Sequence, residues 1–261
     1  MKWHRIEAMV VRHLYAYKRN VDRMTDSFYW PLMDIFIWGL TSSWIQKSQT
    51  DVPHVVAILL TALVFWQIIW RGNYEISVNL LEEFWNQNLV NLFSTPLTLS
   101  EWIASAIILS VIKMCITITV CVIAVYFLYA TNIFTLGWYL IPFVASLLMS
   151  GWIMGFLGSS IIIYWGQKVQ TVAWTMGFLF APFSAVYYPL SQLPGWVQRI
   201  SLMLPTTYIF EGMRAVIATG ELDISMLVRS LVLNVIYLSG ALMLFRFMFE
   251  KSRSKGLARL E

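Results

Sequence analysis

Residues 185–214 read AVYYPLSQLPGWVQRISLMLPTTYIFEGMR and lie between two long apolar runs. The segment contains Pro189, Pro194 and Pro205, yet an apolar stripe continues through it. The stripe consists of Leu193, Trp196, Val197, Ile200 and Leu204. Because water penalises an exposed apolar stripe, we expect two short helices at about residues 193–218 rather than a loop. Proline is tolerated in a first helical turn, so the first helix should start near Pro194, and Pro205 should separate it from a second helix at about residues 206–218.

The composition of the whole chain is that of an integral membrane protein. Of its 261 residues, 59% are hydrophobic and only 12% are charged, whereas a soluble domain has about 25% charged residues. A spanning helix needs roughly 20 apolar residues, and six runs approach that length. They cover residues 28–45, 52–70, 102–129, 136–165, 169–188 and 224–249. The sequence therefore predicts an all-α membrane fold with six transmembrane helices within residues 27–250.

The basic residues predict how these spans are oriented. An even number of spans places both termini on one side of the membrane, and Lys and Arg concentrate on the cytoplasmic side. The terminal segments and the loops on their side carry Lys2, Arg5, Arg12, Lys18, Arg19, Arg23, Arg71, Lys168, Arg246, Lys251, Arg253, Lys255 and Arg259. The opposite side carries only Lys47, Arg199, Arg214 and Arg229. We expect both termini, including a basic tail at 251–261, in the cytoplasm of a cell whose inner membrane holds the protein.

The first 26 residues have the pattern of an amphipathic helix. Apolar residues recur at intervals of three and four, and charged residues occupy the other face. The apolar positions are Trp3, Ile6, Val10, Leu14, Tyr17, Val21 and Met24. Such a helix lies in the cytoplasmic membrane interface, where it serves either as a lipid anchor or as a surface that holds a cytoplasmic partner.

The segment between the second and third spans contains NLLEEFWNQNLVNLFSTPLTLSEW, residues 79–102. A short helix at about 79–94 fits, because Pro96 disfavours helical geometry at Thr95, and Ser100 is expected to cap the third span. Aromatic side chains exposed in the cytoplasm indicate a docking surface, although the helix could instead lie on the lipid interface. The candidate docking residues are Glu82, Glu83, Phe84, Trp85, Asn88, Leu89, Leu92 and Phe93.

Together these features resemble the membrane subunits of the type-2 ABC transporter permease family. The resemblance rests on the amphipathic first helix, the six runs, STPLTLSEW, and the segment PLSQLPGWVQRISLMLPTTYIFEGMR. The last is similar to the family pattern of a proline, a Leu-Pro pair near a Trp, and a Pro-Thr-Tyr segment that ends in Glu and Arg. Polysaccharide exporters of the family often have Asn-Pro where this chain has Leu204-Pro205. That difference favours an exporter of drugs, lipids or glycolipids over one of polysaccharides or lipid-linked glycans.

The resemblance implies partners and a division of labour. Two such subunits pair, as a homodimer or a heterodimer, and each docks a cytoplasmic ATPase subunit on the helix at 79–94. A phosphate-binding loop needs Gly-Lys, and the sequence contains no such pair, so ATP and Mg are expected in the partner ATPase and no cofactor in this chain. Membrane lipids are the other expected partner. Nucleic acid is not an expected partner, because the basic residues cluster beside the apolar runs, as membrane topology requires.

Because water would penalise their apolar face, we expect the helices at 193–218 to turn back and dip into the outer leaflet. There they should cap the external end of the path between paired subunits, as a moving gate or as a passive plug. Glu211 and Arg214 are three residues apart, so they share a helix face and can pair. The candidate gate residues are Pro189, Leu193, Pro194, Trp196, Pro205, Tyr208, Glu211 and Arg214.

Two charged residues lie inside the predicted spans. Asp34 and Lys113 are expected to pair with each other, to line the translocation path, or to face water separately, because a charge in hydrocarbon needs a partner or water. Gly151, Gly155 and Gly158 should allow close helix packing, within the subunit rather than between subunits.

Other functional classes receive little support. His4, His13 and His54 do not form a metal-binding motif, and Cys115 and Cys121 are about 9 Å apart along a helix, too far to bridge. A membrane enzyme that handles glycolipids through Glu211 or Asp223 is the distant alternative. A channel or a passive scaffold would not need a cytoplasmic docking helix.

Overall fold

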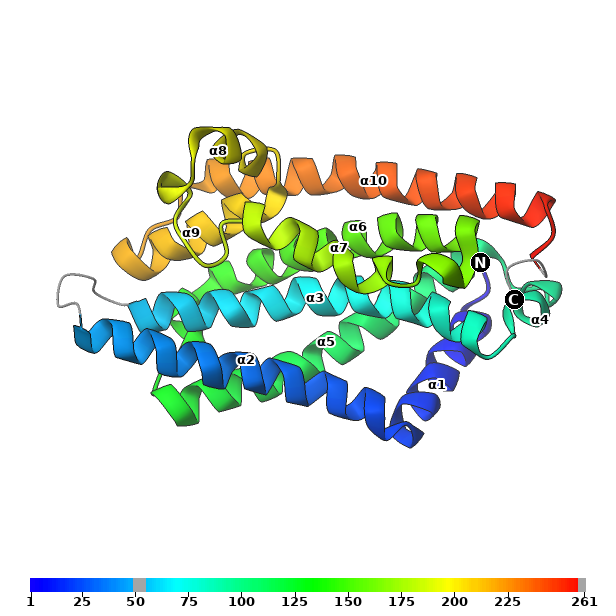
Figure 1. The fold of residues 1–261 in the computed structure, drawn as a ribbon, viewed down its shortest axis with the longest axis horizontal. Helices are drawn as coiled ribbons and strands as arrows, with labels where there is room; N and C mark the ends of the chain where they lie inside the picture. The colour runs from blue at the N-terminus through cyan, green and yellow to red at the C-terminus, as the bar shows by residue number, and fades with distance from the viewer. Residues whose placement is uncertain (49–54, 258–261) are drawn as a thin grey trace.

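The computed structural model describes residues 1–48 and 55–257, and within these residues it contains helices and no strand. The helices are α1 (Trp3–Arg19), α2 (Val21–Ser48), α3 (Val55–Trp85), α4 (Leu89–Ser94), α5 (Leu99–Tyr129), α6 (Leu140–Trp165), α7 (Val172–Phe180), α8 (Gly195–Ser201), α9 (Pro205–Thr219) and α10 (Ile224–Ser254). Short 3-10 turns occur at Ile133–Tyr139, Gly166–Val169, Ala181–Phe183 and Leu190–Gln192. The long helices run along one axis, with α1 and α4 at one end and α8 and α9 at the other (Figure 1).

Within the described residues, four helical segments are long and apolar enough to cross a membrane: Val56–Trp85, Leu99–Tyr129, Ile133–Val169 and Ile224–Ser254. The all-helical prediction is confirmed, and the count of six spans remains a prediction. The predicted run at 169–188 is not one helix, because α7 is nine residues long and passes into a 3-10 turn at Ala181–Phe183. Pro182 lacks the N–H that would continue the helix. The predicted start of the second span at residue 52, His54, and the last four residues of the tail lie outside the described residues.

Helix α3 lies at the centre of the bundle, where it packs against α2, α5, α6 and α7. Its closest neighbour is α6, and glycine makes that approach possible. A Cβ atom added at Gly151 would lie 2.5 Å from the Ile69 carbonyl oxygen and 3.0 Å from the Gly72 Cα. One added at Gly155 would lie 2.7 Å from the Ile76 Cβ. The glycines thus pack inside the subunit, as the sequence predicted.

We expect Gly151→Ala to lower the free energy of unfolding by about 1–3 kcal/mol, because α3 and α6 must separate to admit the methyl group. The matched control is Gly240→Ala on α10, where nothing lies within 4 Å of an added Cβ. Thermal unfolding in detergent measures both variants. A Gly151→Ala protein that melts with the wild-type midpoint would contradict this account of the α3–α6 contact.

A polar seam joins α10 to α6. Ser146, Ser150, Ser230 and Asn234 are buried there. The Ser150 hydroxyl donates to Asn234 Oδ1 over 2.8 Å, and Asn234 Nδ2 donates to the Ser146 carbonyl over 3.0 Å. The Ser230 hydroxyl donates to the carbonyl of Pro205, the first residue of α9, over 2.8 Å. These bonds satisfy polar groups in an apolar bundle and fix α9 to α10.

Candidate functional site

The end of the bundle that carries α1 and α4 differs from the sequence prediction at one helix. The predicted helix at 79–94 is divided, because α3 continues to Trp85, the chain turns at Gln87 with φ of 50°, and α4 begins at Leu89. Arg71 and Glu75, which the sequence analysis assigned to a loop, lie in the buried part of α3. Helix α3 can remain buried there because charged groups on α2 and α5 face it and pair with its polar side chains.

Most of the predicted docking residues face the interior of this subunit. Phe84, Glu83 and Leu89 have no exposed surface, and Leu92 is buried. The expected exposure of Phe84 is therefore wrong. Phe93 is half-buried against Phe249, with ring centroids 4.6 Å apart. The side chains that do reach the surface are Trp85, Asn86, Gln87, Asn91 and Ser94.

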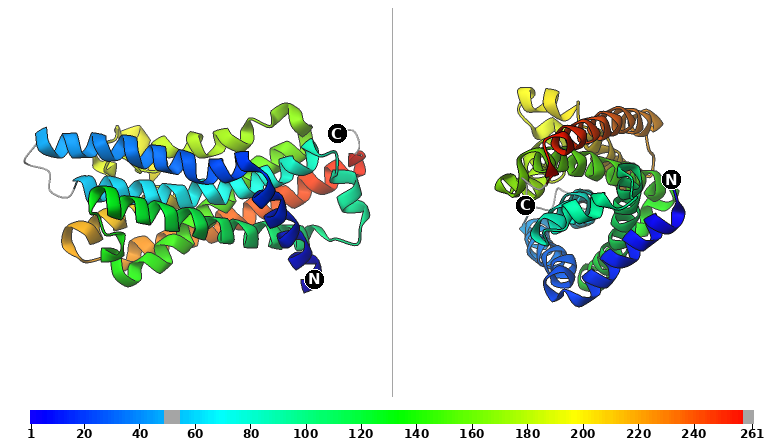
Figure 2. Two further views of the ribbon diagram at one scale, coloured as in Figure 1. Left: turned by 90° about the horizontal axis from the view of Figure 1, so that it is seen from below. Right: turned by 90° about the vertical axis from the view of Figure 1, so that its right-hand side faces the viewer.

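Helix α1 confirms the amphipathic pattern, but it ends at Arg19 rather than near residue 26, and Val21 and Met24 belong to α2. It crosses the bundle obliquely (Figure 2), and its apolar face packs against α5 and α2. The buried side chains on that face are Ile6, Met9, Val10, His13 and Tyr17. The protein itself therefore covers much of the face that the sequence analysis assigned to the membrane interface.

The first turn of α5 is tied to α1. Thr98, rather than the predicted Ser100, is the N-cap, and it forms a capping box with Glu101. The Lys2 backbone N–H donates to Glu101 Oε1 over 2.7 Å, and Arg5 lies 3.5 Å from the other carboxylate oxygen. Arg5 also donates to the Pro96 carbonyl. The N-terminus of α1 is thus held on the connection between α4 and α5.

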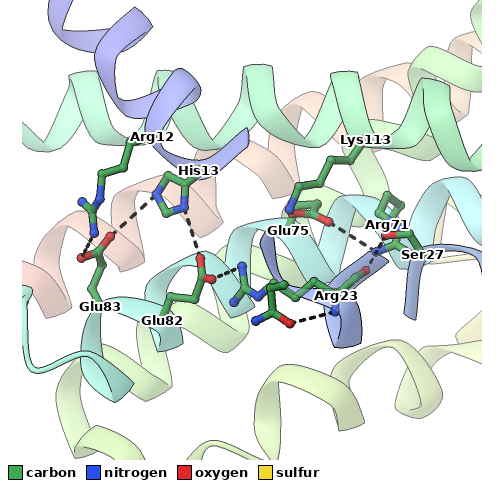
Figure 3. A network of polar contacts seen from close by, with 10 residues as sticks. Arg12, His13, Arg23, Ser27, Arg71, Glu75, Glu82, Glu83 and Lys113 are labelled. Atoms are coloured by element: carbon green, nitrogen blue, oxygen red, sulfur yellow. Dashed lines mark hydrogen bonds and ion pairs between the residues drawn. The ribbon is translucent and has the colours of Figure 1, made fainter. Parts of the chain in front are cut away.

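Glu82 and Glu83 bind α1 and the start of α2 (Figure 3). Arg12 donates to Glu83 over 2.9 Å, and His13 Nδ1 lies 3.2 Å from Glu82. Arg23 of α2 also pairs with Glu82. Asn88, in the turn before α4, donates to Glu83 over 2.6 Å. The two carboxylates therefore connect the α3–α4 turn to both N-terminal helices.

A second charged cluster lies deeper in the bundle (Figure 3). Lys113 of α5 donates to Glu75 over 2.6 Å, and Arg71 lies 3.3 Å from the other oxygen of the same carboxylate. Arg71 also lies 3.6 Å from Asp26 of α2. The alternative in which Asp34 pairs with Lys113 is therefore wrong, because Lys113 pairs with Glu75 of α3. Asp34 instead accepts a hydrogen bond from Gln67 over 3.1 Å.

This cluster adjoins a break in the hydrogen bonding of α2. Pro31 lies inside the helix and has no N–H to donate to the Ser27 carbonyl. The Thr117 hydroxyl of α5 donates to that carbonyl over 3.4 Å. A polar side chain from a neighbouring helix thus replaces the missing backbone donor, as in other membrane helices that contain proline.

Helices α8 and α9, which the sequence places outside the cell, begin where their prolines predicted. Pro194 is the N-cap of α8, and Pro205 is the first residue of α9. Trp196 is 65% exposed, Pro189 precedes the turn at Leu190–Gln192, and Leu193 is half-buried. The Tyr208 hydroxyl donates to the Leu202 carbonyl over 2.7 Å.

The predicted Glu211–Arg214 pair is confirmed, with a separation of 2.8 Å. Arg214 also donates to the carbonyls of Ala185 and Val186, and Glu211 accepts from the Leu190 N–H over 2.8 Å. Arg214 thus holds the chain that follows α7 against α9.

The carboxylates that an external enzyme would use have structural partners. Glu211 pairs with Arg214 and accepts a hydrogen bond from the Leu190 N–H. Asp223 is the N-cap of α10, where hydrogen bonds from Ser225 hold the pKa of its carboxyl below the usual value. Among the residues that the structure describes, no group of three or more His, Cys, Asp or Glu side chains could hold a metal ion. Cys115 and Cys121 are free thiols.

The sequence contains one local signal for the deeper cluster, the spacing of Arg71 and Glu75. Arg71 and Glu75 are four residues apart, a spacing at which side chains meet on one helix face. Reading them as a pair would have extended the second apolar run into α3. Their partners Asp26 and Lys113 come from distant parts of the chain, and neither has a local signal.

The family model described as ABC-2 type transporter matches residues 5–218. No curated protein matches the sequence.

Proposed function

The chain belongs to the ABC-2 type transporter family, and we propose that it is the membrane-spanning subunit of an ATP-driven exporter whose ATPase is a separate protein. Members of the family are transport subunits of the membrane rather than the catalytic component. The observation that carries the proposal is the match over residues 5–218, which includes α1 to α8 and nearly all of α9.

In this proposal the chain crosses the membrane six times, through α2, α3, α5, α6, α7 with the turn that follows it, and α10. Both termini lie in the cytoplasm. The arrangement of the helices supports this orientation, because α1, α4 and the end of α10 lie at one end of the bundle and α8 and α9 at the other (Figure 1). Arg71 is buried and no longer counts toward the positive-inside bias, but the basic residues of α1 and of the end of α10 remain on the first side.

Two copies, or this chain and a paralogue, form the translocation path between them, and the substrate is an amphipathic drug, lipid or glycolipid. Helices α8 and α9 cap the external end of that path in the outer leaflet. Support for a cap comes from their position at the end opposite α4 and from the anchoring of α9 on α10.

The ATPase docks on the α3–α4 turn and the outer face of α4. This surface replaces the one that the sequence suggested, because Phe84 and Leu89 are buried. Its exposed members are Trp85, Asn86, Gln87, Asn91 and Ser94. Movement of this surface reaches α1 through Glu83 and Arg12, and α2 through Glu82 and Arg23. ATP binding and hydrolysis are thereby coupled to the helices that line the path.

The test is co-expression of the chain with the ABC ATPases of its own genome, followed by co-purification and by ATP-dependent export from inverted vesicles. We expect one ATPase to co-purify with this chain. Vesicles that contain both proteins should export an amphipathic substrate, and vesicles without this chain should not. The double variant Gln87→Arg/Asn91→Arg should reduce ATPase association at least about 10-fold, because it places bulky charges in the centre of the docking surface.

The matched control is Ser191→Arg/Gln192→Arg, which alters two exposed residues at the opposite end of the bundle. It should leave association unchanged, and both double variants should melt like the wild type. Wild-type association by the Gln87→Arg/Asn91→Arg protein would exclude this docking surface. Failure of every ATPase to support export would count against the exporter function itself.

A further inference from the structure

A cleft with aromatic and acidic walls opens between α2, α3 and α7. Four of its residues recur every four positions along one face of α2: Asp26, Trp30, Asp34 and Trp38. Residues at this spacing lie above one another on a helix, so acid and tryptophan alternate over about 18 Å. The cleft has a volume of about 560 Å³, which lies in the range of pockets for drug-sized molecules.

The facing walls are also aromatic. On α3, Trp66, Trp70 and Tyr74 recur at the same spacing of four. Trp70 packs against Phe178 of α7 with ring centroids 4.9 Å apart, and Trp38 stacks on Tyr187 at 5.3 Å. These contacts restrict the rings to fixed orientations. The faces of tryptophan and tyrosine rings attract cations, and more strongly where water is excluded.

Asp34 differs from the other carboxylates of this region. Asp26 lies near Arg71, and Glu75 pairs with Lys113 and Arg71. Among the described residues, Asp34 has no Lys, Arg or His within ion-pair distance, and its hydrogen-bond donor is the neutral amide of Gln67. A carboxylate within a membrane helix normally faces a counter-ion or water. Asp34 lines the cleft, so a cation that enters it can serve as this counter-ion.

We infer that this cleft binds the cationic group of an amphipathic organic molecule, with Asp34 as its counter-ion and the aromatic rings as its walls. The inference rests on the proposed function, since it names the class of substrate that the exporter would take. An anion would meet the carboxylates of Asp26 and Asp34. A neutral lipid would fill the apolar walls but leave Asp34 unpaired. The nearby cations Arg71 and Lys113 are buried and paired with Glu75.

Equilibrium dialysis of tetraphenylphosphonium against the purified full chain in neutral-lipid nanodiscs tests this inference. We expect saturable binding to the wild type. Asp34→Asn should weaken that binding at least about 10-fold, because a partly buried charge pair is lost, whereas Asp34→Glu should keep most of it. Asp22→Asn, which removes an exposed carboxylate at the start of α2, should bind like the wild type. Tetraphenylborate, which has nearly the same shape and the opposite charge, should bind far more weakly.

Equal binding by wild type and Asp34→Asn would overturn the inference, as would equal binding of tetraphenylphosphonium and tetraphenylborate, which would indicate an apolar groove. If Asp34→Asn does not fold, tetraphenylphosphonium binding by the Trp30→Leu variant tests the inference instead. Trp30 is 61% exposed, so its loss should not unfold the protein, and loss of its ring face should weaken tetraphenylphosphonium binding about 3-fold. Unchanged binding by Trp30→Leu would overturn the inference.

The assay contains no ATPase, so it separates this inference from the proposed function. Binding that depends on Asp34, together with the absence of ATP-dependent export with any ATPase, would refute the exporter and retain the cation site. ATP-dependent export of neutral or anionic compounds, together with no binding of tetraphenylphosphonium, would refute the cation site and retain the exporter.

Discussion

Replacement of Glu75 by glutamine is expected to lower the free energy of unfolding by about 3–5 kcal/mol, the usual effect of removing one partner from a buried ion pair. The Glu75 carboxylate is buried between Lys113 at 2.6 Å and Arg71 at 3.3 Å. Glutamine would leave both cations buried, and Asp26, at 3.6 Å from Arg71, would be the remaining carboxylate near them. Thermal and chemical unfolding in detergent measure the loss, and a lower yield of folded protein should accompany it.

The control for this prediction is Glu7→Gln, which removes an exposed carboxylate from α1 and should leave stability unchanged. A second variant tests whether the loss of stability comes from the unbalanced charge or from the changed shape of the side chain. Adding Lys113→Met to Glu75→Gln removes one of the two cations that lose the Glu75 carboxylate, so the double variant should be more stable than Glu75→Gln alone. A double variant that loses the sum of the two single effects would show that the charges do not interact.

The same cluster explains which parts of the fold the sequence could predict. Local patterns were sufficient for the amphipathic α1, for the proline-initiated starts of α8 and α9, and for the Glu211–Arg214 pair three residues apart. Hydropathy was not sufficient for α3, because Arg71 and Glu75 resemble loop residues until their partners on α2 and α5 are known. Those partners are distant in the chain, so the predicted second span ends earlier than α3 does. For the same reason the predicted docking helix begins earlier than α4.

The predicted docking site shows a related limit. The mixture of Phe84, Leu89 and Leu92 with charged residues resembled an exposed amphipathic helix. In the structure this apolar face packs onto α5, α6 and α10 of the same chain, and Glu82 and Glu83 pair with α1 and α2. An amphipathic pattern indicates that one face is covered, but it does not say whether the chain itself, lipid or a partner covers it.

Replacement of Arg214 by methionine is expected to lower the free energy of unfolding by about 2–4 kcal/mol, since each buried polar group left unpaired costs about 1–3 kcal/mol. Arg214 is 11% exposed and donates to Glu211, to the Ala185 carbonyl and to the Val186 carbonyl. Ala185 has φ of 52°, a conformation that persists only where its surroundings hold it. Arg214→Lys should lie between methionine and wild type, because one ammonium group cannot match the planar guanidinium fork.

The control is Arg199→Met, which removes an exposed guanidinium from α8 and should melt like the wild type. A cysteine placed at Val186, which is buried, provides a local readout in a background that lacks Cys115 and Cys121. Its reaction with a thiol reagent should accelerate in Arg214→Met and not in Arg199→Met, because Glu211 and Arg214 hold the adjoining chain at Ala185, Val186 and Leu190. An unchanged rate would mean that other contacts fix this segment.

The functional consequence of Arg214→Met distinguishes a gate from a filler. If α8 and α9 form the proposed external cap, detachment of the segment at 185–190 should reduce export per folded molecule at least about 10-fold, since displacement of a positioning element by about 1 Å can reduce a rate to that extent. The ATPase should remain bound, because its proposed docking surface lies at the other end of the bundle. Export that falls only in proportion to the amount of folded protein would instead assign α8 and α9 a purely structural role. The decisive measurement is therefore transport normalised to folded, ATPase-bound complex in wild type, Arg214→Lys, Arg214→Met and Arg199→Met.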